Sequence, residues 1–508
     1  MRSPYRPRQT LPTLPTPSQS VWGQPSPGWL PASSEVQSLE RWFADSDSAK
    51  VAAGLVIRVE GGWRDDELAG WLANALAGRS GWFASAAWWC LAGGARLAAE
   101  VDPDRRAVAW ASVAVLLAQA LPAAGVESSP VASAELPQLT LAEAVAQAKG
   151  PAARAATERA MAETGAAAVL TELLRLACRF PGHAGHLAIS AAALAQLAPS
   201  LAASDLARLL PAIAEGLAEN STQGSWQAAH RQRMATLAER LTAMADRRDP
   251  EKSRAFAEPK FRVHLLDGGA EGALKAMLRA AEVGVPHELL AGSLVMAAAE
   301  RVLRADVHQA ADPDSLEGPA DTQGLLLLAS ATRQLRGQVP ARDWLELALL
   351  TASWTAALAP LDLPESKRTA LPDAASLHQT WDHGPEIAKV IKSLQEGRAE
   401  QAIAVLRAYL LLALPEQPLC VQLRQAAVAL PVAAGLGRCT ATALLNAGID
   451  EFLALADLPQ RERILAAAVR GALSVRAPAD PVLLAEMALR RLQLGGQPES
   501  RVGLGPQF

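Results

Sequence analysis

The chain has 508 residues, a formal net charge of −4, and 50% hydrophobic but only 4% aromatic residues. A chain of this length exceeds what one hydrophobic core usually organises, so we expect two or three units. The apolar content is chiefly Ala and Leu, two strong helix formers without β-branching, which favours an all-α fold. The charge leaves no basic surplus for a phosphate backbone, and no Lys/Arg stripe with interleaved aromatics is present, which argues against nucleic-acid binding.

The first segment, residues 1–34, is rich in Pro, Ser and Thr and lacks the apolar region of a signal peptide. We predict a disordered, Pro-rich N-terminal arm. Trp22 and Trp29 lie among its prolines, and two interpretations are open. The tryptophans fold back onto the body of the protein, or they anchor the arm on a protein partner or a sister subunit, since polyproline-type segments lose little entropy on binding.

Helical periodicity begins at Ser38 and continues to about Leu121, in a segment rich in tryptophan. Tryptophan at helical spacing is more often core than cofactor-binding, so we expect these side chains in the core. The run Ala107–Leu121 is the most membrane-like, but its about fifteen residues fall short of the roughly twenty that a span needs. We therefore predict a buried core helix and no membrane association.

Helices are predicted along the rest of the chain, and no stretch shows the alternation of a β-strand. They cover Leu139–Thr164, Gly165–Cys178, Ser204–Glu219, Trp226–Arg247, Gly324–Leu335, Arg342–Leu358, Pro385–Leu394, Ala399–Leu412, Leu419–Ala434, Thr440–Ala456, Arg461–Val475 and Pro481–Leu492. Ser204 and Asp205 offer an N-cap, and Asp249–Pro259 is predicted to be a polar connection.

The stretch Leu265–Asp314 predicts two helices broken at Gly284 and Pro286, followed by a loop with His308 and several aspartates. The first helix has one apolar face. The second begins at a proline suited to a first turn and is apolar almost all round, so we expect it to be buried.

This helix–break–helix pattern occurs more than once. With an offset of 221 residues and no gaps, Ser46–Ala73 aligns with Asp267–Leu294, and Gln395–Leu419 repeats the pattern more faintly. We therefore predict a duplicated helical-hairpin array of stacked antiparallel helix pairs. Its two related halves would cover residues 38–248 and 260–500.

The four cysteines, Cys90, Cys178, Cys420 and Cys439, lie far apart and form no CxxC or CxH pair. This spacing argues against a disulfide framework and against a sequence-evident zinc or iron–sulfur site. We interpret them as small buried hydrophobes in a reducing compartment, which places the protein in the cytoplasm.

A metal site is the most specific chemistry that the sequence offers. His183 and His186 are three residues apart, which places both on one face of a helix that has begun there. Asp306, His308 and Asp312 lie close together after a predicted buried helix. Carboxylates with imidazoles are the ligands of non-haem iron or manganese sites. The alternative is that the histidines decorate a helix start and that the loop is a solvated turn.

The run Glu300–Leu335 resembles a segment of bacterial all-helical domains that accompany Rieske-type iron–sulfur proteins. Asp306, His308, Asp321 and Arg333 match the acidic residues, histidine and arginine of the family's pattern. The family's second histidine falls on Gly324 and its tryptophan on Pro319. The resemblance implies a family member whose metal or redox site has decayed and that is kept for its shape or partners.

Two functions remain open from the sequence. The first is a non-catalytic helical scaffold or accessory subunit that binds a protein partner, or a second copy of itself, through the N-terminal arm. It needs no cofactor. The second is a metal-dependent oxidoreductase, with iron or another divalent metal held by His183, His186, Asp306, His308 and Asp312 between the helical halves.

Overall fold

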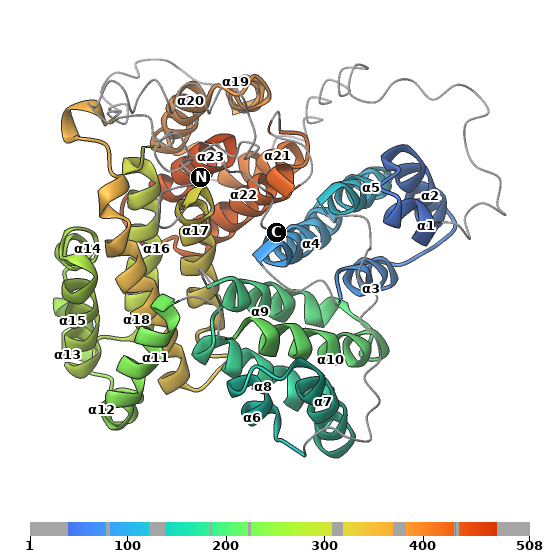
Figure 1. Cartoon of the computed structure of the whole chain (residues 1–508). Helices are drawn as coiled ribbons and strands as arrows, with labels where there is room; N and C mark the ends of the chain where they lie inside the picture. The colour runs from blue at the N-terminus through green and yellow to red at the C-terminus, as the bar shows by residue number, and fades with distance from the viewer. Residues whose placement is uncertain are drawn as a thin grey trace, which may run out of the picture.

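The structure is a computed structural model that describes residues 39–77, 82–120, 138–182, 185–221, 225–306, 318–368, 383–430, 432 and 436–474. These residues form helices joined by turns, and they contain no β-strand (Figure 1). Within them, two isolated β-bridges join Ala305 to Asp362 and Arg336 to Val339. The all-α prediction is therefore confirmed. The arm with Trp22 and Trp29 and the helix predicted at Pro481–Leu492 lie outside the described residues.

The helices are named in chain order. The first twelve are α1 (Leu39–Ala44), α2 (Ser48–Glu60), α3 (Asp65–Leu76), α4 (Trp82–Glu100), α5 (Pro103–Ala120), α6 (Leu141–Ala146), α7 (Gly150–Thr164), α8 (Ala166–Arg179), α9 (His186–Leu197), α10 (Ala203–Asn220), α11 (Ser225–Thr236) and α12 (Ala238–Met244). The others are α13 (Pro250–Ala255), α14 (Glu258–Asp267), α15 (Gly269–Glu282), α16 (His287–Arg304), α17 (Gly318–Leu335), α18 (Ala341–Ala357), α19 (His383–Gln395), α20 (Ala399–Leu411), α21 (Glu416–Ala427), α22 (Leu436–Ala454) and α23 (Glu462–Ser474).

The predicted helix–break–helix unit occurs as α2–α3, α15–α16 and α20–α21. Four residues separate the two helices in every unit. The second of the four has a positive φ in each: Gly62 at 94°, Gly284 at 84° and Ala413 at 53°. The amide that follows bonds to the carbonyl five residues upstream: Trp63 to Arg58, Val285 to Ala280 and Leu414 to Tyr409. This is the Schellman ending of a helix, so the break between the two helices has the same geometry in all three predicted copies.

A second turn recurs in front of α2, α7 and α20. The residue two positions before each helix has a positive φ: Ser46 at 56°, Ala148 at 56° and Gly397 at 70°. The next amide bonds back to the preceding helix over 2.9 Å in all three: Asp47 to Trp42, Lys149 to Ala144 and Arg398 to Ser393. The helices on either side of this turn pack together, as α1–α2, α6–α7 and α19–α20. For the units that begin with α2 and α20, the helix before the unit is therefore a packed partner, and α15 likewise packs on α14.

One continuous hydrophobic core runs through the described residues. Its centre is α22, which packs on α4, α5, α17, α21 and α23, while α9 packs on both α4 and α17 (Figure 1). These contacts cross the predicted boundary between residues 248 and 260. The division into two related halves therefore stays a prediction, and the two parts share their core.

The aromatic and apolar helices are part of this core, as predicted. Trp89 and Trp110 are fully buried, and most of Ala107–Ala120 is buried within α5. Among the described residues one segment, Ala341–Leu361, is long and apolar enough to cross a membrane, but 83% of its apolar window is buried inside the protein. That burial is typical of the core helix of a soluble protein. All four cysteines are free and buried.

Several local predictions were wrong. Leu139–Thr164 is two helices, α6 and α7, with Ala148 at a positive φ between them. Trp226–Arg247 is two helices, because Leu237 interrupts the pattern between α11 and α12. Asp249–Pro259 contains α13 and the start of α14, which begins with a proline in its first turn. Ala202, not Ser204 or Asp205, precedes α10, and it makes no side-chain cap.

The contact between α22 and α23 depends on a glycine. A Cβ added at Gly448 would overlap the Cβ of Ala468, which has no rotamer to move away. We expect Gly448→Ala to lower the free energy of unfolding by about 1–3 kcal/mol, as overpacking does. The measurement is the urea midpoint. Gly272→Ala in α15 is the matched control, because nothing lies within 4 Å of that Cβ position. Alanine should stabilise the protein there by about 1 kcal/mol through helix propensity. Equal midpoints for the two variants would contradict the packing.

Candidate functional site

The five predicted metal ligands divide into two groups. His183, His308 and Asp312 lie outside the described residues. His186 and Asp306 are described, and both are buried, with 6% and 4% of their surface exposed. Among the described residues, no group of three or more His, Cys, Asp or Glu side chains is placed to hold a metal. The metal site therefore stays a prediction that depends on the undescribed ligands.

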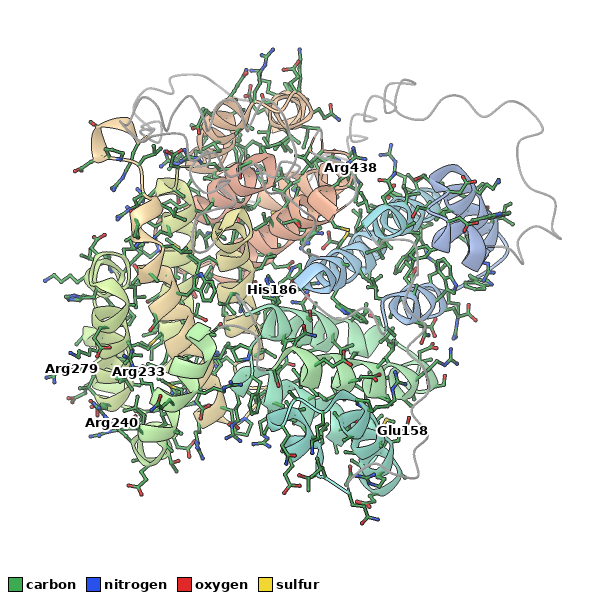
Figure 2. The ribbon with its side chains drawn as sticks, viewed as in Figure 1. Glu158, His186, Arg233, Arg240, Arg279 and Arg438 are labelled. Atoms are coloured by element: carbon green, nitrogen blue, oxygen red, sulfur yellow. The ribbon has the colours of Figure 1, made fainter. Side chains whose placement is uncertain are left out.

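His186 is the first residue of α9, where α9 meets α4 (Figure 2). Its Nδ1 lies 3.3 Å from the hydroxyl of Ser85 in α4. The preceding Gly185 has a φ of 75°, and a Cβ there would overlap Leu328 of α17. The turn into α9 thus needs glycine for two reasons, and it fixes the imidazole between α4 and α9.

Asp306 follows the C-terminal end of α16. Its amide donates to the carbonyl of Leu361 over 2.7 Å, and the amide of Leu363 donates to the carbonyl of Arg304 over 2.8 Å. The fully buried Arg301 supports this pairing from α16, since its Nη1 lies 2.6 Å from Asp362. The start of the acidic loop is therefore anchored on both sides by backbone bonds.

The charged groups that the structure brings together in the interior are different ones. Glu451 of α22 is fully buried and pairs with Arg333 of α17. It also accepts a hydrogen bond of 2.6 Å from the Ser330 hydroxyl. Burial raises the pKa of Glu451, and the Arg333 guanidinium opposes that rise. Arg333 is also the arginine that matches the Rieske-associated pattern, and here it binds a carboxylate in the core.

Asp450, the residue before Glu451, forms ion pairs with two further arginines. Arg424 of α21 reaches it over 2.6 Å, and Arg96 of α4 pairs with it from the other side. Arg424 also lies 3.2 Å from Glu100 of α4. We call Asp450 and Glu451 the α22 acidic pair. Ion pairs of these two residues therefore link α22 to α4, α17 and α21.

A second buried set of carboxylates lies near the start of α18. Asp343 and Glu346, here called the α18 acidic pair, are each 6% exposed. They face Arg175 and Arg179 of α8 at 3.9–4.0 Å. Burial raises the pKa of both carboxyls, against the opposing effect of these arginines. Burial and the same carboxylates also raise the pKa of the nearby Cys178 thiol well above its ordinary value.

Sequence reasoning missed both acidic pairs. The signal for them was present: each is a pair of acidic residues inside an otherwise apolar helix, DWLE in α18 and IDEF in α22. A carboxylate in a buried helix needs a partner charge. The partners could not be named, because Arg333 lies more than a hundred residues from Glu451 in sequence.

No protein-family model, no curated protein and no solved structure matches the chain.

The Arg333–Glu451 pair gives a stability prediction. Arg333→Ala leaves a carboxylate buried without its counter-charge, so the free energy of unfolding at pH 7.5 should fall by about 3–5 kcal/mol. Because the pKa of Glu451 is raised in the folded protein, the folded state takes up a proton before the unfolded chain as the pH falls. The loss should therefore shrink between pH 7.5 and pH 5. Urea unfolding at several pH values measures it.

Two further variants test the assignment. The double change Arg333→Met with Glu451→Gln removes both charges and should recover most of the lost stability. Arg64→Ala breaks the exposed Arg64–Asp66 pair and should cost less than about 1 kcal/mol. A pH-independent loss in Arg333→Ala would contradict a buried, ionised Glu451.

Proposed function

We propose that the protein is a non-catalytic helical scaffold or accessory subunit that binds a protein partner. The observation that carries this proposal is the recurrence of one unit, with the same four-residue break, in α2–α3, α15–α16 and α20–α21. Arrays of repeated helix pairs present extended surfaces that other proteins bind. The resemblance of residues 300–335 to helical domains that accompany Rieske-type proteins supports an accessory role.

The buried charges also support a structural role. The α22 and α18 acidic pairs both face arginines from other helices. Charges in such pairs hold helices in register. The net charge of −4 favours a protein partner or a second copy of this chain over nucleic acid. The free cysteines support the cytoplasm as the compartment.

The arm gives the experiment that tests the proposal. If the arm is extended, as its composition predicts, deleting residues 1–34 should leave the helical circular dichroism unchanged and the melting temperature within about 2 °C. The same deletion should weaken an oligomer seen by light scattering, or the recovery of partners cross-linked to the full chain in its own cell. Trp22→Ala with Trp29→Ala in the full chain should reproduce the loss. A collapse of the fold on deletion would show that the arm belongs to the core.

The second candidate is a metal-dependent oxidoreductase. It is favoured by the burial of His186 and Asp306, each within three residues of an undescribed predicted ligand, His183 and His308. Metal analysis of the purified chain tests it. If this candidate holds, iron, manganese or zinc should be present at about one atom per chain and should be lost in His308→Ala but kept in His378→Ala. If the scaffold proposal holds, neither substitution changes the metal content, which stays far below one atom per chain.

A further inference from the structure

Charged side chains cover the outer face of α15. One face of this helix is buried through Ala273, Met277 and Ala281. Lys275 and Arg279, which are one turn apart, lie on the opposite face and are exposed. The outer face of α15 is therefore charged and open to solvent.

Two neighbouring helices add arginines to this face. Arg233 of α11 pairs with Glu271 over 2.9 Å, and Arg240 of α12 pairs with Glu282 over 2.5 Å. Figure 2 shows Arg233, Arg240 and Arg279 together at the edge of the molecule formed by α11, α12 and α15. The chain that follows α12 supplies one more cation, Arg247. We call the whole surface the α15 basic face, and it consists of Arg233, Arg240, Arg247, Glu271, Lys275, Arg279 and Glu282.

A backbone contact places Arg247 beside the end of α15. The amide of Asp249, two residues after Arg247, donates to the carbonyl of Gly284 over 2.9 Å. Gly284 is itself two residues past Glu282, the last residue of α15. The exposed Arg247 is therefore held next to the C-terminal end of this helix.

Three guanidinium groups surround the carboxylate of Glu282. The hydrogen bond from Arg240 lowers the pKa of this carboxyl against the effect of burial, and Arg279 and Arg247 lower the pKa further through their charges. Arg240 forms the ion pair with Glu282. Within the described residues, Arg247 and Arg279 form no ion pair and no side-chain hydrogen bond. Two exposed guanidinium groups in this part of the chain therefore have no counter-ion of their own.

The α15 basic face carries an excess of positive charge. Its two carboxylates, Glu271 and Glu282, lie among five cations. When the exposed Glu239 of α12 is counted as well, the cations still exceed the carboxylates by two. Arg248 and Asp246, one of each sign, do not change this balance. The excess is local, because the whole chain has a net charge of −4.

We propose that the α15 basic face binds an acidic segment of a protein partner, whose carboxylates pair with Arg247 and Arg279. The proposal rests on the scaffold function proposed above, because it names the chemistry of the partner. The surface is separate from the N-terminal arm, so the two can be tested independently.

An acidic polypeptide fits this surface better than other anions do. Guanidinium groups bind carboxylates through two parallel hydrogen bonds, and arginine is enriched at protein interfaces. Val283 is 36% exposed at the end of α15, and it offers an apolar contact that a polypeptide can use and a free phosphate cannot. Nucleic acid and anionic membranes bind broad basic surfaces. Here Glu271 and Glu282 interrupt the cations, and the net charge of the chain repels a large polyanion.

Fluorescence anisotropy of the full chain with a labelled peptide of alternating glutamate and alanine tests the proposal. The wild type should bind this peptide saturably at physiological ionic strength, and it should not bind the same peptide with glutamine in place of glutamate. Arg247→Glu combined with Arg279→Glu should lower the affinity at least about tenfold, because two charged contacts are lost and two repulsions are added.

The matched control reverses two exposed arginines elsewhere. Arg208→Glu in α10 combined with Arg398→Glu before α20 changes the net charge by the same amount. It should alter the affinity by less than about twofold, because salt screens charges that lie far from the bound peptide.

Three results would overturn the proposal. The first is no saturable binding of the glutamate peptide by the wild type. The second is equal affinity in the Arg247→Glu, Arg279→Glu variant and in the control variant. The third is a single-stranded oligonucleotide, or a vesicle containing phosphatidylserine, that binds as tightly as the peptide and is lost in the same variant, because the occupant would then be a different anion.

The arm and the basic face fail separately. Deleting residues 1–34 should leave the affinity for the peptide unchanged. Failure of the arm experiment would therefore count against the scaffold function, whereas failure of the peptide experiment counts against the basic face alone.

A measurement on the wild-type chain keeps the proposal testable if the charge-reversal variant does not fold. A benzophenone at one end of the glutamate peptide should cross-link, on irradiation, to residues 240–283, which include α12 and α15. Cross-links confined to other parts of the chain would refute the proposal.

Discussion

The structure depends on one constraint: two adjacent carboxylates, Asp450 and Glu451, lie in α22, the helix at the centre of the hydrophobic core. A charge in the core is tolerated only when opposite charges and hydrogen bonds surround it. Here those partners come from three other helices, Arg96 in α4, Arg333 in α17 and Arg424 in α21. The positions of these helices around α22 are therefore fixed by charge as well as by apolar burial. A shift of any one of them by a turn would leave an unpaired ion in the core.

Small residues make this arrangement possible. A carboxylate on α22 can reach arginines on several helices only if the helix axes approach closely, and Gly448 against Ala468 shows how close that approach is. On the α4 side, Gly93 has the same role, because a side chain there would overlap Asn446. Asn446 in turn accepts a hydrogen bond from Arg424 over 3.4 Å. Alanine, together with glycine at the closest helix contacts, therefore lets the buried ion pairs reach between helices.

The local part of the structure could be read from the sequence. Helix periodicity and the glycine at position 284 predicted the α15–α16 unit, and the 221-residue offset placed its copy at α2–α3 to within one residue. The break at Ala413 carries no such signal, because only the fold forces alanine to a positive φ there. The sequence could not predict which residues far apart in the chain would contact each other. Nothing local in Arg333 or His287 indicates that one meets Glu451 and the other stacks on Trp344. For the candidate metal site, the sequence predicted ligand types and spacing, but His186 and Asp306 alone do not make a site.

The repeated turns and the buried ion pairs have separate roles in this fold. Helix pairs built on the same turn resemble one another closely enough to pack in the wrong order, since apolar faces of alanine and leucine discriminate poorly between partners. Buried ion pairs do discriminate, because a misplaced helix would bury one charge without its counter-charge. The two acidic pairs differ in spacing, adjacent in α22 and three residues apart in α18, and each faces arginines from its own set of helices. The repeated turns therefore generate the array, and the unique charges determine which helix lies beside which. A surface built in this way keeps one shape, as the scaffold function proposed above would require.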